Sequence, residues 1–566
     1  MAAMKSWLSG LLIAALLVGG VTAFHHQRQN RDTRAERAMR DGILLLGNGT
    51  EPASLDPQIA TGVTESNIIV CLFEGLVTYH QTDDDGVEPG VAERWESNED
   101  ASEWTFHLRA DARWSNGDPV TAHDFVWAFE RMLTPALGAD YANMMYVFDQ
   151  AEAFHKKEID DFSKVGVKAV DDRTLKLRLV GPTPHLPYML QHKVFLPLHP
   201  STILAHGKMA DRISLWARPG NMVSNGPFQL KAWRFNDVIE VERNPHYWDA
   251  EVVGLNEIHF FPIENANTEE RAFRSGLLHY CYTVPLERME FWRQQENAPE
   301  FRIHPYFGTY YYRFNVTRPP LDDPRVRKAL TMAIDRQGII DNILRGGQTP
   351  AWSITPPMPN LYEPPKGTEF NVEKARELLA EAGFPGGAGF PAKAILINTS
   401  EAHRVIAEAI QAMWQRNLGI RVGITNQDWQ VYLSTQSNLE YDISRAGWIG
   451  DYLDPISFLD MWMTGHGMNQ TGWSNEEFDA LIQAATREGD AETRLDILHR
   501  AESLMMEESP IAPIYIYTRI FLLDPRVKGW HPKMIDFRPM KYVHFAMEEE
   551  LEQGEVEAPG ATGSAP

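Results

Sequence analysis

Two opposite charges and a large aromatic side chain lie within one short stretch, residues 445–455. Arg445 and Asp451 are separated by five residues, among them Trp448. Glycines at 447 and 450 and a proline at 455 predict irregular backbone here, not a helix interior or a central strand. A zwitterionic peptide would satisfy both charges, with its ammonium at Asp451 and its carboxylate at Arg445. The alternative is a surface turn whose charged side chains are solvated.

Seven further segments carry a wider resemblance. They are residues 48–57 (NGTEPASLDP), 72–76 (LFEGL), 104–109 (WTFHLR), 114–122 (WSNGDPVTA), 225–228 (NGPF), 244–248 (NPHYW) and 310–330, which includes YYYRFN and PPLDDPRVRKAL. In this order, and together with residues 445–455, they resemble the periplasmic oligopeptide-binding proteins of ABC importers, family 5 of the bacterial extracellular solute-binding proteins. The resemblance covers almost the whole chain.

The resemblance implies eight positions that contact the ligand. They are Asp451, Arg445, His403, Trp429, Glu51, Gly447, Trp448 and Tyr141. In the family, a histidine opening a helix, a tryptophan beginning the next loop and the Arg and Asp of the ligand loop face the peptide. His403 would lie in a first helical turn, where free backbone N–H groups also favour an anion. For His403 the alternative is a solvated polar residue, and for the two tryptophans it is core packing.

Two departures from the family pattern affect these expectations. A basic residue that some relatives carry seven positions after the tryptophan is Gln436 here, which leaves open how the protein treats ligand length and acidic side chains. Some relatives also join the loop to the strand before it by a disulfide, at positions that are Gly308 and Ile449 in this chain. We therefore expect packing alone to hold the loop.

Composition indicates a large globular protein without a nucleic-acid surface. The chain has 566 residues and a formal net charge of -24, so two or three domains are expected and basic binding patches are not. The two cysteines, Cys71 and Cys281, provide no disulfide framework, and the apolar run around Cys71 predicts a buried thiol. We expect no metal and no cofactor.

The N-terminal residues predict export. Lys5 precedes an apolar run that ends with a small-residue cleavage pattern at residues 21–23, so residues 1–23 resemble a signal peptide. An uncleaved anchor is the alternative, because the run approaches the length that spans a bilayer. We expect a periplasmic protein, membrane-anchored if the segment is not cleaved. A polar spacer (24–40) follows, and the acidic, Pro/Gly-rich tail (548–566) is expected to be disordered.

Helix–strand alternation along the chain predicts α/β lobes with central sheets. The resemblance implies the rest of the architecture: a periplasmic-binding-protein-like fold whose two lobes have central mixed sheets and are joined by a hinge, with an extra small α/β domain. Lobe I would contain residues 41–65, 190–284 and 520–547, lobe II residues 285–519, and the small domain residues 66–189. The hinge is expected near residues 283–285, since a proline there ends a strand. Strands are expected at 42–46, 174–180, 238–243, 257–262 and 420–424. Helices are expected at 122–133, 267–275, 324–345 and 372–381, and further ones from 400 and from a capping box at 474–477.

The function that follows is capture of short, extended peptides and their delivery to an inner-membrane ABC permease, by a protein that we expect to be a monomer. Strand-edge hydrogen bonds would supply affinity without reading sequence. The same fold specialised for a murein peptide, a sugar or a metal complex is the alternative. We do not expect an enzyme: the common nucleophile, zinc and nucleotide motifs are absent, and a carboxylate pair of Asp451 with Glu51 would lack an activated water.

Overall fold

One mixed sheet dominates the structure, a computed structural model that describes residues 32–84, 86–295, 298–358 and 361–546. In these ranges the sheet has 11 strands, with the order β15-β14-β16-β12-β17-β11-β1-β10-β9-β8 and β13 paired to β17. The strands are β1 (Ile43–Gly47), β8 (Phe228–Arg234), β9 (Val238–Arg243), β10 (Glu257–Phe261), β11 (Tyr280–Cys281), β12 (Phe301–Phe314), β13 (Thr349–Pro350), β14 (Lys393–Asn398), β15 (Val422–Gln427), β16 (Ile443–Ile449) and β17 (Ile511–Leu523).

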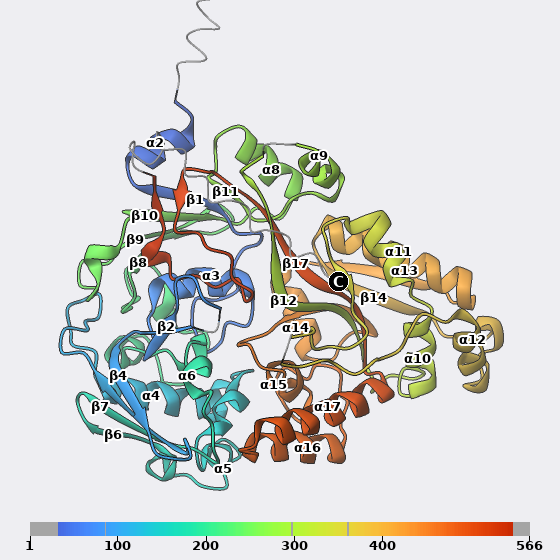
Figure 1. The fold of residues 1–566 in the computed structure, drawn as a ribbon, viewed down its shortest axis with the longest axis horizontal. Coiled ribbons are helices and arrows are strands. Elements are labelled where there is room, and N and C mark those ends of the chain that lie inside the picture. Colours follow the sequence, from blue (N-terminus) through green and yellow to red (C-terminus); the bar gives the residue numbers. More distant parts are fainter. Residues whose placement is uncertain (1–31, 85, 296–297, 359–360, 547–566) are drawn as a thin grey trace, which may run out of the picture.

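The two longest strands, β12 and β17, connect the halves of this sheet. They pair antiparallel from Phe301 and Leu522 at one end to Arg313 and Ile511 at the other. Figure 1 shows them running between the half that carries β1, β8, β9 and β10 and the half that carries β14. The protein is therefore α/β and two-lobed, as expected, with the sheet continuous between the lobes.

A separate antiparallel sheet has the order β4-β5-β7-β6, with strands β4 (Ala92–Ser97), β5 (Glu103–Leu108), β6 (Val167–Asp171) and β7 (Thr174–Arg178). The alternation that predicts β7 is visible in its burial, since Leu175 and Leu177 are buried and Lys176 is exposed. Two short antiparallel pairs, β2 (Val77–Tyr79) with β3 (Val87–Pro89) and β18 (Val527–Lys528) with β19 (His544–Phe545), complete the strands of the described residues. The four-stranded sheet lies inside the segment expected to be a small domain; the domain boundaries themselves remain predictions.

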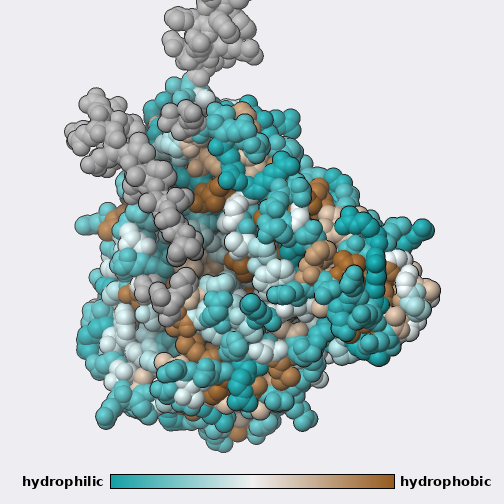
Figure 2. Space-filling view, turned by 45° about the vertical axis from the view of Figure 1, so that its right-hand side comes forward, coloured by the Kyte–Doolittle hydropathy of each residue, from teal (hydrophilic) through white to brown (hydrophobic). Residues whose placement is uncertain are grey.

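Helices cover the sheets. They are α2 (Arg34–Arg40), α3 (Val63–Leu72), α4 (Ala122–Leu133), α5 (Ala151–His155), α6 (Leu186–Met189), α7 (Pro200–Ala205), α8 (Ala266–Arg274), α9 (Met289–Arg293), α10 (Pro324–Met332), α11 (Arg336–Ile339), α12 (Val372–Glu381), α13 (Glu401–Leu418), α14 (Trp429–Ser437), α15 (Ile456–Leu459), α16 (Glu476–Arg487) and α17 (Ala491–Glu508). A core formed wholly by residues between Tyr310 and Tyr515 joins β12, β14 and β16 to α10, α12 and α13. On the face shown in Figure 2, apolar side chains form separate patches among hydrophilic ones.

Several predicted elements needed correction. The single helix expected at 324–345 is broken, because Asp335 caps a new helix by accepting a hydrogen bond from the Gly338 N–H. The capping residue of α16 is Asn475 and not the residue before it. The strand expected at 420–424 begins at Val422 and extends to Gln427.

Both chain ends extend past the described residues. Of the expected spacer, Arg34–Arg40 forms α2, whose Ala35 and Ala38 are buried. The expected signal segment (1–23) and tail (548–566) lie outside the described ranges. Within those ranges, no helix combines the length and the apolar character needed to span a membrane.

Candidate functional site

A cavity of about 690 Å³ contains the stretch that the sequence singles out. Every residue from Arg445 to Asp451 lines it, and the opposite wall includes Tyr141, His192 and Lys193 from another part of the chain. The volume is in the range of clefts that enclose small ligands. The cavity is therefore the candidate ligand site.

The backbone of this stretch differs from the prediction. Residues 445–449 are not irregular: they belong to strand β16, which pairs antiparallel with β12 from Ile443 to Ile449. Glycine is favoured at position 447 because a Cβ atom there would overlap the hydroxyl of Tyr517. The expected irregular backbone begins only at Gly450.

One edge of β16 faces the cavity without a strand beside it. The neighbour on that side, β14, pairs with Ile443 and Ser444 only. From Arg445 to Ile449 this edge therefore has no partner strand in the described part of the chain, although Tyr432 and Gln436 side chains donate to the Arg445 carbonyl. An edge of this kind can accept an extended peptide as an additional strand.

Arg445 has polar and aromatic neighbours but no counter-ion. Its guanidinium donates to Asn398 Oδ1 at 3.3 Å and to the Tyr517 hydroxyl at 3.1 Å, and it lies 4.8 Å above the centre of the Tyr310 ring. Its Nε has no partner, and no carboxylate of the described residues lies within ion-pair distance. The Arg445 side chain is therefore held in place and can still donate hydrogen bonds to a ligand carboxylate.

At the other end of the stretch, Asp451 is buried beside two basic groups. His192 Nε2 lies 3.3 Å from Asp451 Oδ1, and the same nitrogen lies 3.3 Å from Lys193 Nζ. Burial raises the pKa of Asp451 to about 7, with the Lys193 charge opposing the shift. Burial likewise lowers the pKa of Lys193 to about 8, opposed by Asp451 and Glu65.

The single nitrogen shared by these groups cannot satisfy both. If His192 Nε2 donates to Asp451, it cannot accept from the Lys193 ammonium, and the reverse also holds. Burial holds the pKa of His192 well below its usual value, so the ring is neutral, and its Nδ1 has no partner. A ligand ammonium would remove this conflict. It would donate to Asp451 in place of His192, and His192 Nε2 could then accept from Lys193.

Six of the eight expected contact residues line the cavity. They are Tyr141, Trp429, Arg445, Gly447, Trp448 and Asp451. Trp429 begins helix α14 instead of a loop, and its indole N–H donates to Glu65 Oε1 at 3.2 Å. Trp448 also packs, since it is 6% exposed and donates to the Ser457 carbonyl.

His403 and Glu51 are not among the lining residues. The His403 ring lies against Tyr310, with 5.6 Å between ring centres, so it borders the ring on which Arg445 rests. Glu51 accepts hydrogen bonds from the Trp233 indole and the Asn236 N–H, which fixes the turn after β8. In this structure both residues support the site from outside the cavity.

Sequence reasoning missed several charged or polar lining residues, among them Glu65, His192, Lys193 and Arg313. A signal was present for three of them. His192 and Lys193 interrupt the apolar residues 186–198, and Arg313 interrupts an aromatic strand. A charge inside an apolar run indicates either a buried ion pair or a site.

The two positions that carry a disulfide in some relatives are opposite each other. Gly308 on β12 is the register partner of Ile449 on β16. The Ile449 side chain occupies the space that a side chain at 308 would need. Packing thus holds this corner, as expected.

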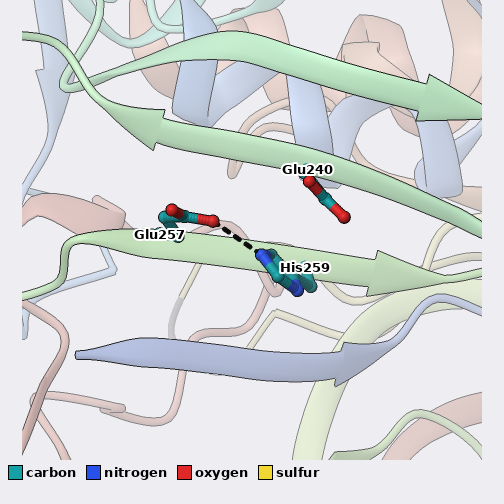
Figure 3. Close-up of side chains that lie close together, drawn as sticks. All are labelled: Glu240, Glu257 and His259. Carbon is teal, nitrogen blue, oxygen red and sulfur yellow. Dashed lines mark hydrogen bonds and ion pairs between the residues drawn. The ribbon is translucent and has the colours of Figure 1, made fainter. Parts of the chain in front are cut away.

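Among the described residues, one group has a metal-ligand composition: Glu240, Glu257 and His259 on β9 and β10 (Figure 3). Glu257 already pairs with Lys231 at 2.6 Å and with His259 at 2.8 Å, and Glu240 pairs with Arg234 at 2.6 Å. None of the three lines the cavity. These charges are balanced within the protein.

Known proteins resemble this chain over most of its length. The periplasmic oligopeptide-binding protein OppA of Salmonella typhimurium is 37% identical over 93% of this chain and 95% of its own. A crystal structure of Haemophilus influenzae OppA in complex with RPPGFSPFR has a TM-score of 0.83 at 33% identity, covering 90% of this chain and 99% of that one. The Escherichia coli murein tripeptide binding protein MppA has a TM-score of 0.84 at 33% identity, covering 89% and 98%.

A structure of the periplasmic murein tripeptide binding protein MppA in its unliganded open form gives a TM-score of only 0.60. The arrangement of the lobes described here therefore differs from that open form. Residues 86–470 match the family described as "Bacterial extracellular solute-binding proteins, family 5 Middle". With this match over more than half of its length, the chain belongs to family 5 of the bacterial extracellular solute-binding proteins.

Proposed function

We propose that this protein captures short peptides in extended form between its two lobes, in the periplasm, and delivers them to the membrane permease of an ABC importer. The observation that carries the proposal is the free edge of β16 between two opposite charges in one cavity, the half-buried Arg445 and the buried Asp451. Related proteins are described as periplasmic oligopeptide-binding proteins, which supports the same ligand class.

The length of the unpaired β16 edge favours short peptides. The four residue steps from Arg445 to Ile449 span about 13 Å of strand. A fully extended peptide covers about 3.3 to 3.6 Å per residue, so three or four residues match that edge. The peptide would pair with β16 through its backbone, which makes binding tolerant of sequence.

Each peptide terminus would meet a fixed counter-charge. Asp451 takes the ammonium, which also resolves the conflict at His192. Arg445 takes the carboxylate through its planar guanidinium. Both pairs are screened from water by the cavity walls, where an unpaired charge would be costly.

The same arguments support a binding protein over an enzyme. The lining shows no activated nucleophile: His192, which contacts Asp451 and Lys193, forms no hydrogen bond with a serine, threonine or cysteine side chain of the described residues. The separate apolar patches on the face in Figure 2 support a monomer.

Small-angle scattering tests the proposal. Addition of a saturating tripeptide should reduce the radius of gyration, because a ligand favours the closed state by the contacts it makes there. Mass spectrometry of the same sample should recover the peptide intact. A constant radius together with release of cleaved peptide would overturn the proposal in favour of an enzyme.

A further inference from the structure

The cavity contains a second guanidinium without a counter-ion, and this one is buried. Arg313, on β12, is 3% exposed and lines the cavity. It donates to Gln470 Oε1 and, at 3.3 Å, to the Tyr311 hydroxyl, while its Nε has no partner. No carboxylate of the described residues lies within ion-pair distance of it.

Other buried arginines of this chain are compensated differently. Arg131 forms a two-pronged pair with Asp56, and Arg519 pairs with Asp536 at 2.6 Å. Arg336 has no carboxylate, but it packs on the Trp352 ring and does not line the cavity. Among the buried arginines of the described residues, only Arg313 lines the cavity, and it has no counter-ion. Because an uncompensated buried ion costs several kcal/mol, a partner supplied by the ligand is the expected remedy.

The net charge of the cavity lining also favours an anionic partner for Arg313. Its lining contains five Lys or Arg residues against three Asp or Glu residues, a formal charge of +2, whereas the whole chain carries -24. Near Arg313 the neighbours are neutral: Gln470 donates to Ser437 Oγ at 3.2 Å, and Gln436 donates to Ser444 Oγ at 2.7 Å. A positive cavity in an acidic protein favours an anionic ligand.

Register separates this cation from the one assigned to the peptide terminus. Arg313 is opposite Ser444 on β16, and Arg445 is opposite Tyr312. Arg445 therefore lies on the face of Tyr310, while Arg313 lies on the face of Tyr311. Alternate side chains of an added strand point to opposite faces, so a group that reaches Arg313 comes from a different peptide residue than the terminus at Arg445.

We propose that Arg313 is a specificity-determining residue that pairs with an acidic side chain of the bound peptide, so that the protein prefers peptides containing Asp or Glu. This inference rests on the proposed peptide-binding function. Some relatives carry a basic residue at the position of Gln436. In this chain Arg313, on β12, would supply that positive charge to the ligand instead.

Isothermal titration with matched tripeptides tests the inference. Ala-Ala-Ala variants carrying Glu, Gln or Lys at each position are compared on the unmodified protein, on Arg313→Gln and on Arg313→Lys. At one position Glu should bind at least about tenfold more tightly than Gln, as expected when a buried ion pair is completed. The ratio should fall to about one in Arg313→Gln and be partly kept in Arg313→Lys. Arg404→Gln, which removes an exposed charge on α13 outside the cavity, should keep the full ratio.

The outcomes separate the two proposals. If the tripeptides bind but Glu and Gln are equal at every position, the role of Arg313 is wrong and peptide binding stands. If no tripeptide binds, the proposed function itself fails. A Glu preference that survives in Arg313→Gln would assign it to another cation, such as Lys193. Should the variants not fold, a crystal structure with the preferred Glu peptide decides: a carboxylate bonded to Arg313 supports the proposal, and a carboxylate elsewhere overturns it.

Discussion

Replacement of Asp451 by asparagine tests the ammonium site. Truncation of one partner in a buried charge pair costs about 2 to 5 kcal/mol. The burial of Asp451 raises its pKa to about 7, so in the free protein only about half of the Asp451 carboxyl groups are ionised at pH 7. This reduces the cost by about 0.4 kcal/mol. Lys193 and His192 compensate the carboxylate further, so we expect about 2 to 3 kcal/mol, a loss of about 30- to 150-fold in affinity.

Calorimetry at pH 7 with trialanine and N-acetyl-trialanine measures this effect as a double-mutant cycle. Acetylation should weaken binding to the unmodified protein by a similar factor, and it should cost the Asp451→Asn variant little more, because both changes remove the same ion pair. Asp172→Asn removes the same charge from a side chain that is 81% exposed and outside the cavity, and it should bind normally. Equal affinity for the free and acetylated peptides would refute the assignment, as would losses that simply add.

Three further predictions follow from the site. Below pH 7, Asp451 must lose a proton to pair with the ammonium, so affinity should rise about tenfold per unit from pH 5 to 7, and it should fall above pH 8 as the peptide amine deprotonates. Proton release measured in buffers of different ionisation enthalpy should vanish in Asp451→Asn, and a flat profile would contradict the assignment. Arg445→Ala should weaken tripeptides more than pentapeptides in a calorimetric length series, and the same loss at every length would make Arg445 structural. Cysteines at 308 and 449 are direct cross-strand partners and should form a disulfide, seen as a loss of two titratable thiols; retention of both free thiols would contradict the register.

Local patterns were sufficient for many elements of the fold. Helix α4 and strand β9 have the predicted bounds. Thr121 caps the start of α4, and β9 is a short segment of apolar and charged residues bounded by turns. The break between α10 and α11 was missed because the apolar spacing continues through it, while the Asp335 cap ends the helix locally. The family resemblance, and not periodicity, supplied the two-lobed architecture.

Residue patterns alone predicted the site only within one short stretch, and the family resemblance added Tyr141 and Trp429. Arg445 and Asp451 were found because they are close in sequence, but their glycine-rich stretch was wrongly expected to be irregular. Five register pairs with β12 keep residues 445–449 extended, and local propensity cannot predict such long-range pairing. His192 and Lys193 lie more than 250 positions before Asp451, so only the fold brings them to it.

Native mass spectrometry of the protein as purified tests the central claim most directly, because a ligand enclosed between two lobes can remain bound during purification. The account predicts a series of bound masses that fit mixed peptides of about three or four residues. The inference about Arg313 adds that these peptides are enriched in Asp and Glu, which fragmentation of the released ligands would show. One discrete mass that does not correspond to a peptide would contradict the account.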